Sequence, residues 1–516
     1  MRNRWSAYKK MHKWPGLIIS VFLLYYGLTG IFMNHRHFFS GIDIDRDILP
    51  EVYKYANWNN AAIKGNLIIN PDSILIYGNI GIWLTDSGFR DYQSFNHGFP
   101  KGSDNRKIFD VHQSADGEIY AATLFGLYAY DRARKTWISF PINNNNERFT
   151  GIESIGDTIY TINRSYVFIG KSKGVQTDFI KTELPAPEGY TDKVGLFETI
   201  WQLHSGEIFG VPGKLFVDLL GLITVFLSVT GIIYFFFPSW IKRCKLKSKS
   251  TESINRINKW SLKWHNHTGA WFFGFIIFLF FTGIFLRPPL LIAIANAKVS
   301  PIKYSHLDQP NPWHDKLRDI LYDKERNILL LSTSDGICYT NKNLDKPEFF
   351  SIQPPVSVMG INTFEKFNNE AYLIGSFSGL FLWHPSRPEI FNYANGKVVG
   401  NESTGRPIGD VKITGTIKDC NGNLYMADYD QGVFPVRHNQ RFPEISQTIL
   451  EESKMSLWNL SLEIHTGRIF QTIIGDFYIL IVPLIGIAGV IVVFSGYMLW
   501  RRKYKKPKKM IVQNSD

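Results

Sequence analysis

The stretch YKKMHKWPGLIISVFLLYYGLTGIF at residues 8–32 returns in altered form as SLKWHNHTGAWFFGFIIFLFFTGIF at residues 261–285. Aligning the two copies places His12 over His265 and superimposes their common TGIF endings. Each copy joins a basic, aromatic start to an uncharged run of helix-forming length. The chain is therefore built from two related halves, each with a histidine at the start of an apolar helix.

A second, shorter repeat follows in each half, LHSGEIF from Leu203 and IHTGRIF from Ile464, which places His204 over His465. Each half thus carries one histidine before each of two apolar helices. Haem iron takes axial imidazoles on opposite faces of the porphyrin, so its ligands should come from different helices. Four imidazoles in two pairs predict bis-histidine ligation of two haems.

Four apolar runs, at residues 14–33, 215–237, 270–286 and 477–500, contain no charged residue except Asp218 and are long enough to cross a hydrocarbon layer of about 30 Å. The first run lacks a small-residue cleavage site and has a copy in mid-chain, so we expect a retained helix rather than a signal peptide. The predicted fold is a four-helix membrane bundle in a 2+2 pseudo-repeat.

The net charge of +12 is concentrated beside these runs. The segments at residues 1–13, 238–264 and 501–516 together hold 20 Lys and Arg against 2 acidic residues. By the positive-inside rule these segments are cytoplasmic and the two long loops face outward. Because the basic residues flank helix ends, nucleic acid binding is disfavoured.

The cysteines indicate little about chemistry. Cys338 and Cys420 fall in the outer loops, where a disulfide is possible but not implied, and Cys244 falls in a cytoplasmic segment. The chain has no CxxC or CxxCH, which disfavours covalently attached haem and a thioredoxin-like redox pair.

The outer loops predict an all-β domain. Short β-rich runs broken by Gly, Asn and Asp repeat about every 40 to 50 residues, three per loop, a pattern typical of propeller blades. GLY at residues 126–128 and GLF at residues 379–381 resemble the two-component-regulator type of propeller repeat. We expect a six-bladed propeller of 3+3 blades; two separate β-sandwiches are the alternative.

The pattern predicts an ordered series of segments along the chain. They are transmembrane helix 1–40, first β half 50–195, transmembrane helix 198–238, basic cytoplasmic loop 239–264, transmembrane helix 265–290, second β half 305–450, transmembrane helix 456–501 and basic tail 502–516.

In this topology His12 and His265 meet near the cytoplasmic surface and His204 and His465 near the outer surface, which makes a relay across the bilayer. Gly16, Gly206, Gly269 and Gly467 follow these histidines and allow close approach of a macrocycle or a helix. An interfacial role is the plain alternative for each histidine, and repetition in both halves favours ligation.

Other residues keep open roles. His267 is an alternative to His265, and His35 and His37 could be alternative ligands, metal contacts or substrate contacts, or solvated boundary residues. Arg287, before two prolines, either pairs with a haem propionate or an anionic substrate, or snorkels at a helix end.

The chain resembles the PepSY-associated transmembrane family, described as iron-regulated membrane proteins and including bacterial ferric-siderophore reductases. The matching motifs are HKWPG at residues 12–16, LTG at residues 28–30, LHSG at residues 203–206 and their second-half copies. The family's outer loops usually carry PepSY α/β modules, whereas this chain has blade-like repeats, so the resemblance leaves the substrate open.

The resemblance implies a bacterial inner-membrane protein with both termini cytoplasmic and periplasmic loops. It implies two b-type haems that pass electrons outward to reduce the ferric iron of a siderophore or other chelate. The donor is then a quinol or a separate flavoprotein, since the cytoplasmic segments contain no GxGxxG or P-loop. The competing function is a membrane-anchored propeller acting as a sensor or docking platform; a transporter is weaker.

Overall fold

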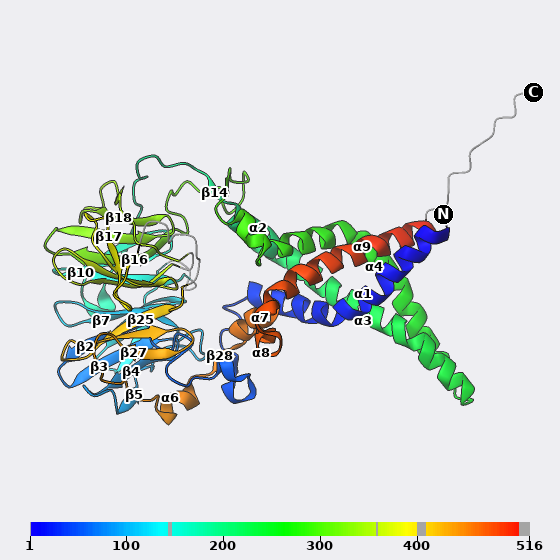
Figure 1. Ribbon diagram of the computed structural model, residues 1–516, viewed down its shortest axis with the longest axis horizontal. Helices are drawn as coiled ribbons and strands as arrows, with labels where there is room; N and C mark the ends of the chain where they lie inside the picture. Colours follow the sequence, from blue (N-terminus) through cyan, green and yellow to red (C-terminus); the bar gives the residue numbers. More distant parts are fainter. Residues whose placement is uncertain (1, 143–146, 358–359, 400–408, 505–516) are drawn as a thin grey trace, which may run out of the picture. The chain divides into compact units, whose positions relative to one another are not determined.

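The computed structural model describes residues 2–142, 147–357, 360–399 and 409–504. The chain folds as two compact units, and each unit draws on both halves of the sequence (Figure 1). The helical unit comprises Met1–Arg36, Asp192–Asp308 and Trp458–Asp516, and the β unit comprises His37–Thr191 and Gln309–Leu457.

Four long helices form the helical unit: α1 (Arg2–Asn34), α3 (Gly210–Leu246), α4 (Glu252–Ile284) and α9 (Ile481–Tyr504). They belong to four spans that are long and apolar enough to cross a membrane. Most residues in their apolar windows face outward, and such a surface is stable when lipid covers it. The four predicted membrane helices are confirmed as elements of the fold.

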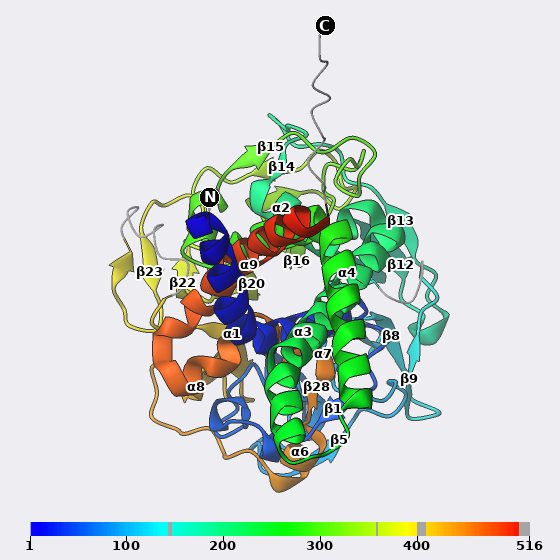
Figure 2. The same cartoon turned by 90° about the vertical axis from the view of Figure 1, so that its right-hand side faces the viewer.

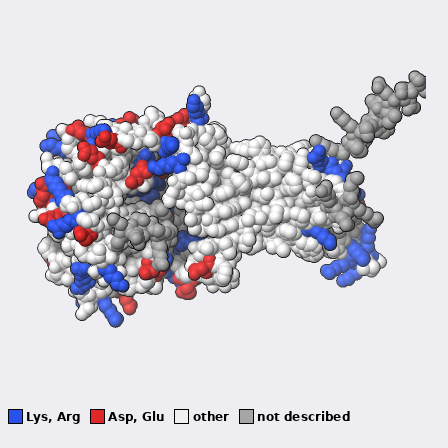
Figure 3. Space-filling view, turned by 45° about the horizontal axis from the view of Figure 1, so that its top comes forward, with Lys and Arg blue, Asp and Glu red and all other residues white. Residues whose placement is uncertain are grey.

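The basic segment at residues 239–264, expected as a loop, is mostly helical. Helix α3 continues to Leu246 and α4 begins at Glu252, so only residues 247–251 connect them. Lys and Arg are good helix formers, and basic side chains at a helix C-terminus are favoured by the helix dipole. On the face in Figure 3 the helices carry uncharged surface along their middle, with Lys and Arg gathered at one end.

Helix α1 packs against α3 and α9, and α4 packs against the same two helices. Helices α1 and α4 therefore lie on one diagonal of the bundle (Figure 2). Small residues bring the neighbours together: a Cβ on Gly27 would lie 2.8 Å from the Gly221 carbonyl oxygen. In the other half, Phe280 packs directly against Gly489. Glycine on at least one partner allows both crossings.

The described residues also form five short helices, of which all but α6 belong mainly to the helical unit. They are α2 (Leu196–Ser205), α5 (Leu290–Ile294), α6 (Gln447–Glu452), α7 (Leu457–His465) and α8 (Gln471–Ile474).

The described part of the β unit contains six larger antiparallel sheets, in each of which the strands follow chain order. The first half supplies three sheets: β2 (Gly65–Asn70), β3 (Ser73–Gly78), β4 (Gly81–Thr85) and β5 (Tyr92–Ser94); β6 (Ile108–Gln113), β7 (Ile119–Thr123), β8 (Gly126–Asp131) and β9 (Thr136–Ser139); β10 (Phe149–Ile155), β11 (Thr158–Asn163), β12 (Val167–Lys171) and β13 (Ile180–Thr182).

The second half supplies the other three sheets: β16 (Leu317–Asp323), β17 (Ile328–Thr333), β18 (Gly336–Thr340) and β19 (Glu348–Phe349); β20 (Ile361–Lys366), β21 (Tyr372–Ser376), β22 (Gly379–Trp383), β23 (Ile390–Asn392) and β24 (Val398–Val399); β25 (Ile413–Lys418), β26 (Leu424–Asp428) and β27 (Gly432–Pro435). Two small sheets pair β1 (Asp43–Ile44) with β28 (Met455–Ser456), and β14 (Val194–Gly195) with β15 (Lys298–Val299). The predicted all-β domain is confirmed.

Each of the six sheets buries its apolar face against the next. The first strand of every sheet contacts the first strand of the following one, and β25 contacts β2. Between the last and first sheets, Tyr425 and Ile417 pack with Trp83 and Trp58. Both tryptophans are fully buried. Cys338 and Cys420 are free, the former buried and the latter exposed.

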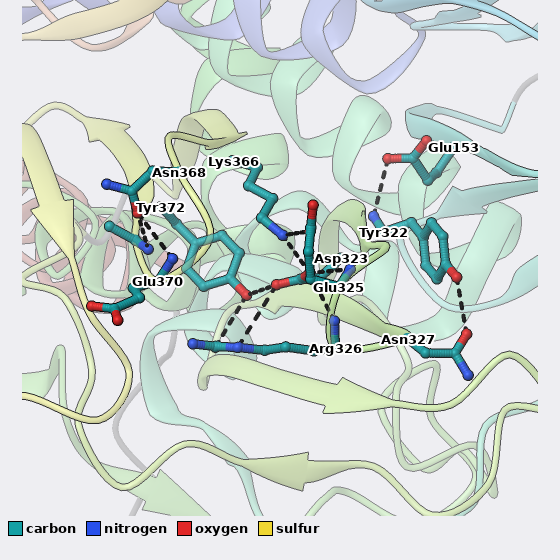
Figure 4. Close-up of polar contacts among 11 residues, drawn as sticks. Glu153, Tyr322, Asp323, Glu325, Arg326, Asn327, Lys366, Asn368, Glu370 and Tyr372 are labelled. Carbon is teal, nitrogen blue, oxygen red and sulfur yellow. Dashed lines mark hydrogen bonds and ion pairs between the residues drawn. The ribbon is translucent and has the colours of Figure 1, made fainter.

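Polar contacts join neighbouring sheets as well. Asp323, fully buried at the end of β16, accepts hydrogen bonds from the Tyr372 hydroxyl and the Lys366 ammonium (Figure 4). Lys366 also pairs with Glu325, and Arg326 lies beside Asp323. A buried carboxylate with this many donors is compensated, so the cluster has a structural role.

The first strands also carry buried carboxyl groups with few donors. Burial raises the pKa of Asp110 on β6 to about 6 and that of Glu153 on β10 to about 7, and it raises the pKa of Asp319 on β16 as well. Asp110 accepts hydrogen bonds from the Ile152 amide at 2.8 Å and the Tyr77 hydroxyl at 3.3 Å. These bonds offset only part of the desolvation.

This arrangement predicts that the β unit loses stability as pH rises. Asp110 titrates near 3.8 when unfolded and about 6 when folded, so the unfolding free energy falls between those values. The cost of ionising it is on the order of 2–3 kcal/mol. Asp110→Asn should raise the melting temperature of the detergent-purified chain at pH 7.5 and change it little near pH 3.5, where the carboxyl group is still mostly protonated in both states.

Asp72→Asn, in the exposed turn between β2 and β3, is the matched control and should shift neither melt. Scanning fluorimetry of full-length protein gives the comparison. An Asp110→Asn variant that is less stable than wild type at pH 7.5 would contradict the expectation.

Candidate functional site

The four repeated histidines lie on four different elements of the helical unit. His12 and His265 occupy corresponding positions on α1 and α4. His204 and His465 lie in the last turns of the short helices α2 and α7. Both short helices are followed by a glycine in the left-handed region, with φ of 78° and 74°, where residues with a Cβ are disfavoured. These turns direct the chain towards α3 and α9.

The structure brings the histidines together in the two predicted pairs. The ring centroids of His12 and His265 are 6.0 Å apart, and those of His204 and His465 are 6.3 Å apart. Each pair combines one histidine from each half of the chain. The pairing of distant segments therefore follows the sequence repeat.

Hydrogen bonds to backbone carbonyls fix two of the rings. The Nδ1 atom of His12 lies 2.9 Å from the carbonyl oxygen of Val492 on α9. The Nδ1 atom of His204 lies 3.1 Å from the carbonyl oxygen of Leu279 on α4. A carbonyl accepts only, so both Nδ1 atoms carry the proton and both Nε2 atoms keep a lone pair.

Threonine hydroxyls fix the other two rings. His265 Nδ1 lies 3.0 Å from Thr230 Oγ1, and His465 Nδ1 lies 3.1 Å from Thr29 Oγ1. Each hydroxyl already donates to a carbonyl four residues earlier in its own helix. The hydroxyl oxygen is thus left to accept the Nδ1 proton, and these two Nε2 atoms are also lone-pair donors.

A glycine of a neighbouring helix packs against every one of the four histidine rings, and we call each such glycine the seat of its histidine. In each case it follows the threonine or serine of a Thr-Gly or Ser-Gly step on the neighbouring helix. A methyl group on the glycine would approach the histidine Cε1 to 3.4 Å at Gly30 (His465), 3.3 Å at Gly231 (His265), 2.9 Å at Gly283 (His204) and 2.7 Å at Gly496 (His12).

Two of these four glycine seats were not predicted from the sequence. Thr29-Gly30 and Thr282-Gly283 belong to the TGIF repeat, but Thr230-Gly231 and Ser495-Gly496 were not singled out. Their signal was a hydroxyl residue followed by glycine inside the second helix of each half. Ser495 differs in detail, because its hydroxyl donates to the Val492 carbonyl that also accepts from His12.

The two pairs lie at different depths of the bundle. On α1, His12 is eighteen residues before Gly30, the seat of His465. On α4, His265 is eighteen residues before Gly283, the seat of His204. At 1.5 Å per residue this is about 27 Å along the helix, close to the thickness of a hydrocarbon layer.

The other candidate residues lie outside the two pairs. His35 Nε2 is 2.6 Å from Asp218 Oδ2, so His35 pairs with a carboxylate. His37 packs against Phe125, and His267 packs against Trp271 and Tyr504. None of these three rings faces a ring of the two pairs in the described contacts.

Arg287 lies just beyond the end of α4. Its guanidinium is 5.8 Å from the ring centre of Tyr478, and its Nε atom is buried without a hydrogen-bond partner in the described part of the chain.

The paired rings fit a bis-imidazole iron site. A metal–imidazole bond is about 2 Å long, and the ring centre lies about 1 Å further, so two axial imidazoles place their centroids about 6 Å apart. Free Nε2 lone pairs and Nδ1 donors to carbonyl or hydroxyl are the features of metal-bound histidine. Within the described residues there is no cluster of three or more His, Cys, Asp or Glu suited to a bare metal ion.

The sequence pattern of the PepSY-associated TM region matches residues 2–237 and again residues 233–503. The chain belongs to this family. It is therefore a multi-pass membrane protein with a duplicated family region, as the two repeats predicted. No curated protein matches the chain.

Solved structures resemble the chain only weakly. The extracellular domain of a putative hybrid two-component system, BT4673 from B. thetaiotaomicron, is 13% identical at a TM-score of 0.36, and the match covers 76% of this chain and 34% of that one. The dihydro-heme d1 dehydrogenase NirN is 7% identical at a TM-score of 0.26, over 76% and 56% of the two chains. The chain thus spans about a third of the first structure, and scores this low assign no fold.

The glycine seats predict a selective effect of adding one methyl group. Gly283→Ala places a methyl 2.9 Å from His204 Cε1 and should destabilise the helical unit by about 1–3 kcal/mol through overpacking. Gly274→Ala on the same helix meets nothing within 4 Å and should be neutral or stabilising by up to about 1 kcal/mol. Thermal unfolding in detergent compares the two.

Equal melting temperatures for the two alanine variants would show that the ring does not rest on Gly283.

Proposed function

We propose that the helical unit binds two b-type haems, one between His12 and His265 and one between His204 and His465. The observation that supports this most is the orientation of the four rings. All four direct a lone-pair Nε2 away from a fixed Nδ1 hydrogen bond, and they do so in pairs at the spacing that one iron needs.

When bound, the haems supply one-electron redox chemistry at two depths of the membrane. The chain's own residues set the conditions for it. The Nδ1 hydrogen bonds hold each imidazole in one tautomer and raise its basicity as a ligand. The glycine seats allow each ring to approach a neighbouring helix closely, and the apolar bundle surrounds the sites with a low dielectric.

We further propose that the substrate is ferric iron in a siderophore-type chelate outside the membrane. Hard oxygen donors hold Fe(III) much better than Fe(II), so adding one electron weakens the complex and releases the metal. Arg287 at the outer end of α4 is a candidate contact for an anionic group. The electron donor is a quinol or a separate flavoprotein, because the cytoplasmic segments carry no nucleotide-binding motif.

The proposed orientation places the basic helix ends in the cytoplasm and the β unit in the periplasm of a bacterial inner membrane. It rests on the basic residues at the ends of α3 and α9, such as Arg243 and Arg501. The six sheets, each packed on the next with β25 against β2, support a six-bladed propeller of 3+3 blades. Such a ring offers a rigid platform for a chelate or a partner.

The first test is the reduced-minus-oxidised visible spectrum of detergent-purified protein with a pyridine haemochrome count. Wild type should hold about two b-type haems per chain, and His204→Ala and His265→Ala should each hold about one. His267→Ala is the matched control and should keep two, because that ring packs against Trp271 and Tyr504 instead.

A colourless wild-type protein from a haem-replete host would exclude the redox function. The result would favour the anchored β domain as a sensor or docking platform.

The Nδ1 partners predict a second effect. Thr230→Val removes one of two acceptors near the His265 Nδ1 proton, the other being the Leu227 carbonyl, and should lower haem affinity at the inner pair about 10-fold. Thr224→Val on the same helix removes a hydroxyl that bonds only its own helix, and should leave affinity unchanged. Haem titration of apoprotein from a haem-deficient host measures both.

Equal affinities for the two valine variants would contradict the role of the Thr230 hydroxyl.

A further inference from the structure

Four buried hydrogen-bond donors of the helical unit have no partner within the described part of the chain. They are the hydroxyl groups of Tyr26 and Ser261, the indole N–H of Trp500 and the Nε atom of Arg287, whose side chain also has a hydrogen bond to Tyr478. Buried polar groups in proteins are almost always hydrogen-bonded, and an exception points to an absent water, ion or ligand. Two amide oxygens, on Gln202 and Asn258, share this state but are acceptors.

Two of the donors flank the outer histidine pair. Tyr26 lies one helical turn before Gly30, and its ring centre is 5.3 Å from that of His465. Arg287 lies one turn after Gly283, the seat of His204. The Arg287 charge also acts electrostatically on the Tyr26 hydroxyl, which places the two donors near each other.

The other two donors lie on one side of the inner pair, whereas Tyr26 and Arg287 lie before and after the outer pair along the parallel helices α1 and α4. Ser261, which is fully buried, lies one turn before His265 on α4. Trp500 lies one turn after Gly496, the seat of His12, on α9. Residues four apart share one face of a helix, so both donors lie on the face that holds the histidine or its seat.

A haem between the paired imidazoles presents one kind of strong anionic acceptor, its two propionate carboxylates. We infer that Tyr26 and Arg287 bind the propionates of the outer haem, and that Ser261 and Trp500 bind those of the inner haem. This inference rests on the proposed function. It accounts for the buried donors at both pairs with a single ligand chemistry.

The two propionate sites differ in charge. Of the four donors only Arg287 is cationic, and a charge-assisted bond to a carboxylate is about twice as strong as a neutral one. A cation near the iron stabilises the reduced, less positive state. Arg287 therefore raises the midpoint potential of the outer haem and favours electron flow outward.

The test is an anaerobic spectroelectrochemical titration of the full-length protein in detergent. Arg287→Met is made in two backgrounds: His265→Ala, which keeps only the outer haem, and His204→Ala, which keeps only the inner one. The midpoint potential should fall in the first background and stay unchanged in the second. Arg287→Lys, which keeps the charge, should restore most of the potential.

A matched pair tests the neutral donors. Tyr26→Phe should lower the potential of the outer haem, whereas Tyr25→Phe, at a neighbouring exposed side chain, should not. Trp500→Phe should lower the potential of the inner haem alone. Haem dimethyl ester, which lacks the carboxylates, should bind wild-type apoprotein more weakly than haem does, and this difference should shrink in Arg287→Met and Tyr26→Phe.

The outcomes separate this inference from the proposed function. A wild-type protein with fewer than two haems would overturn both. Two haems whose potentials do not respond to Arg287→Met, Tyr26→Phe or Trp500→Phe would overturn the propionate assignment alone, as would wild-type apoprotein that binds haem and its dimethyl ester equally well.

Discussion

The hydrogen bond from each histidine Nδ1 to a neighbouring helix is the interaction on which the rest of the helical unit depends. It fixes the tautomer, leaves Nε2 with its lone pair and joins α1 to α9, α4 to α3, α2 to α4 and α7 to α1. Each acceptor lies near a glycine, which allows the ring to approach the helix. Without this bond an imidazole in an apolar bundle would lack both orientation and compensation for its burial.

Duplication of the sequence explains why the hydrogen bond from a histidine Nδ1 to a neighbouring helix occurs four times. The same eighteen-residue spacing on α1 and α4 sets the two histidine pairs about 27 Å apart along the helices, which is close to the thickness of a hydrocarbon layer. The two halves bring their helices together with different residues at the crossing. Gly27 faces Gly221 in one, whereas bulky Phe280 faces Gly489 in the other. The β unit repeats the principle, since each half supplies three sheets.

The sequence predicted the helices and the β domain, and it set His12 with His265, and His204 with His465, at the same depth, because repeats preserve spacing. It left open which histidines pair as ligands. It did not reveal the seats at Gly231 and Gly496, which lie inside apolar runs where Thr-Gly and Ser-Gly look like ordinary packing. The sequence also predicted a loop at residues 239–264, because a run of Lys and Arg suggests a polar connection between helices. These residues are good helix formers, and most of the segment is helical. The buried donors Tyr26 and Trp500 depend on which helix face turns inward.

Electron transfer across a sealed membrane tests the central claim most directly. Full-length protein is reconstituted into vesicles that contain a ferric chelate and a ferrous indicator, and a membrane-impermeant reductant is added outside. The account predicts that wild-type vesicles form ferrous iron inside, while vesicles with His204→Ala, which retain the inner haem, do so at the rate of protein-free vesicles. Equal rates for wild type and His204→Ala, with wild type fully loaded, would contradict a two-haem path through the bundle.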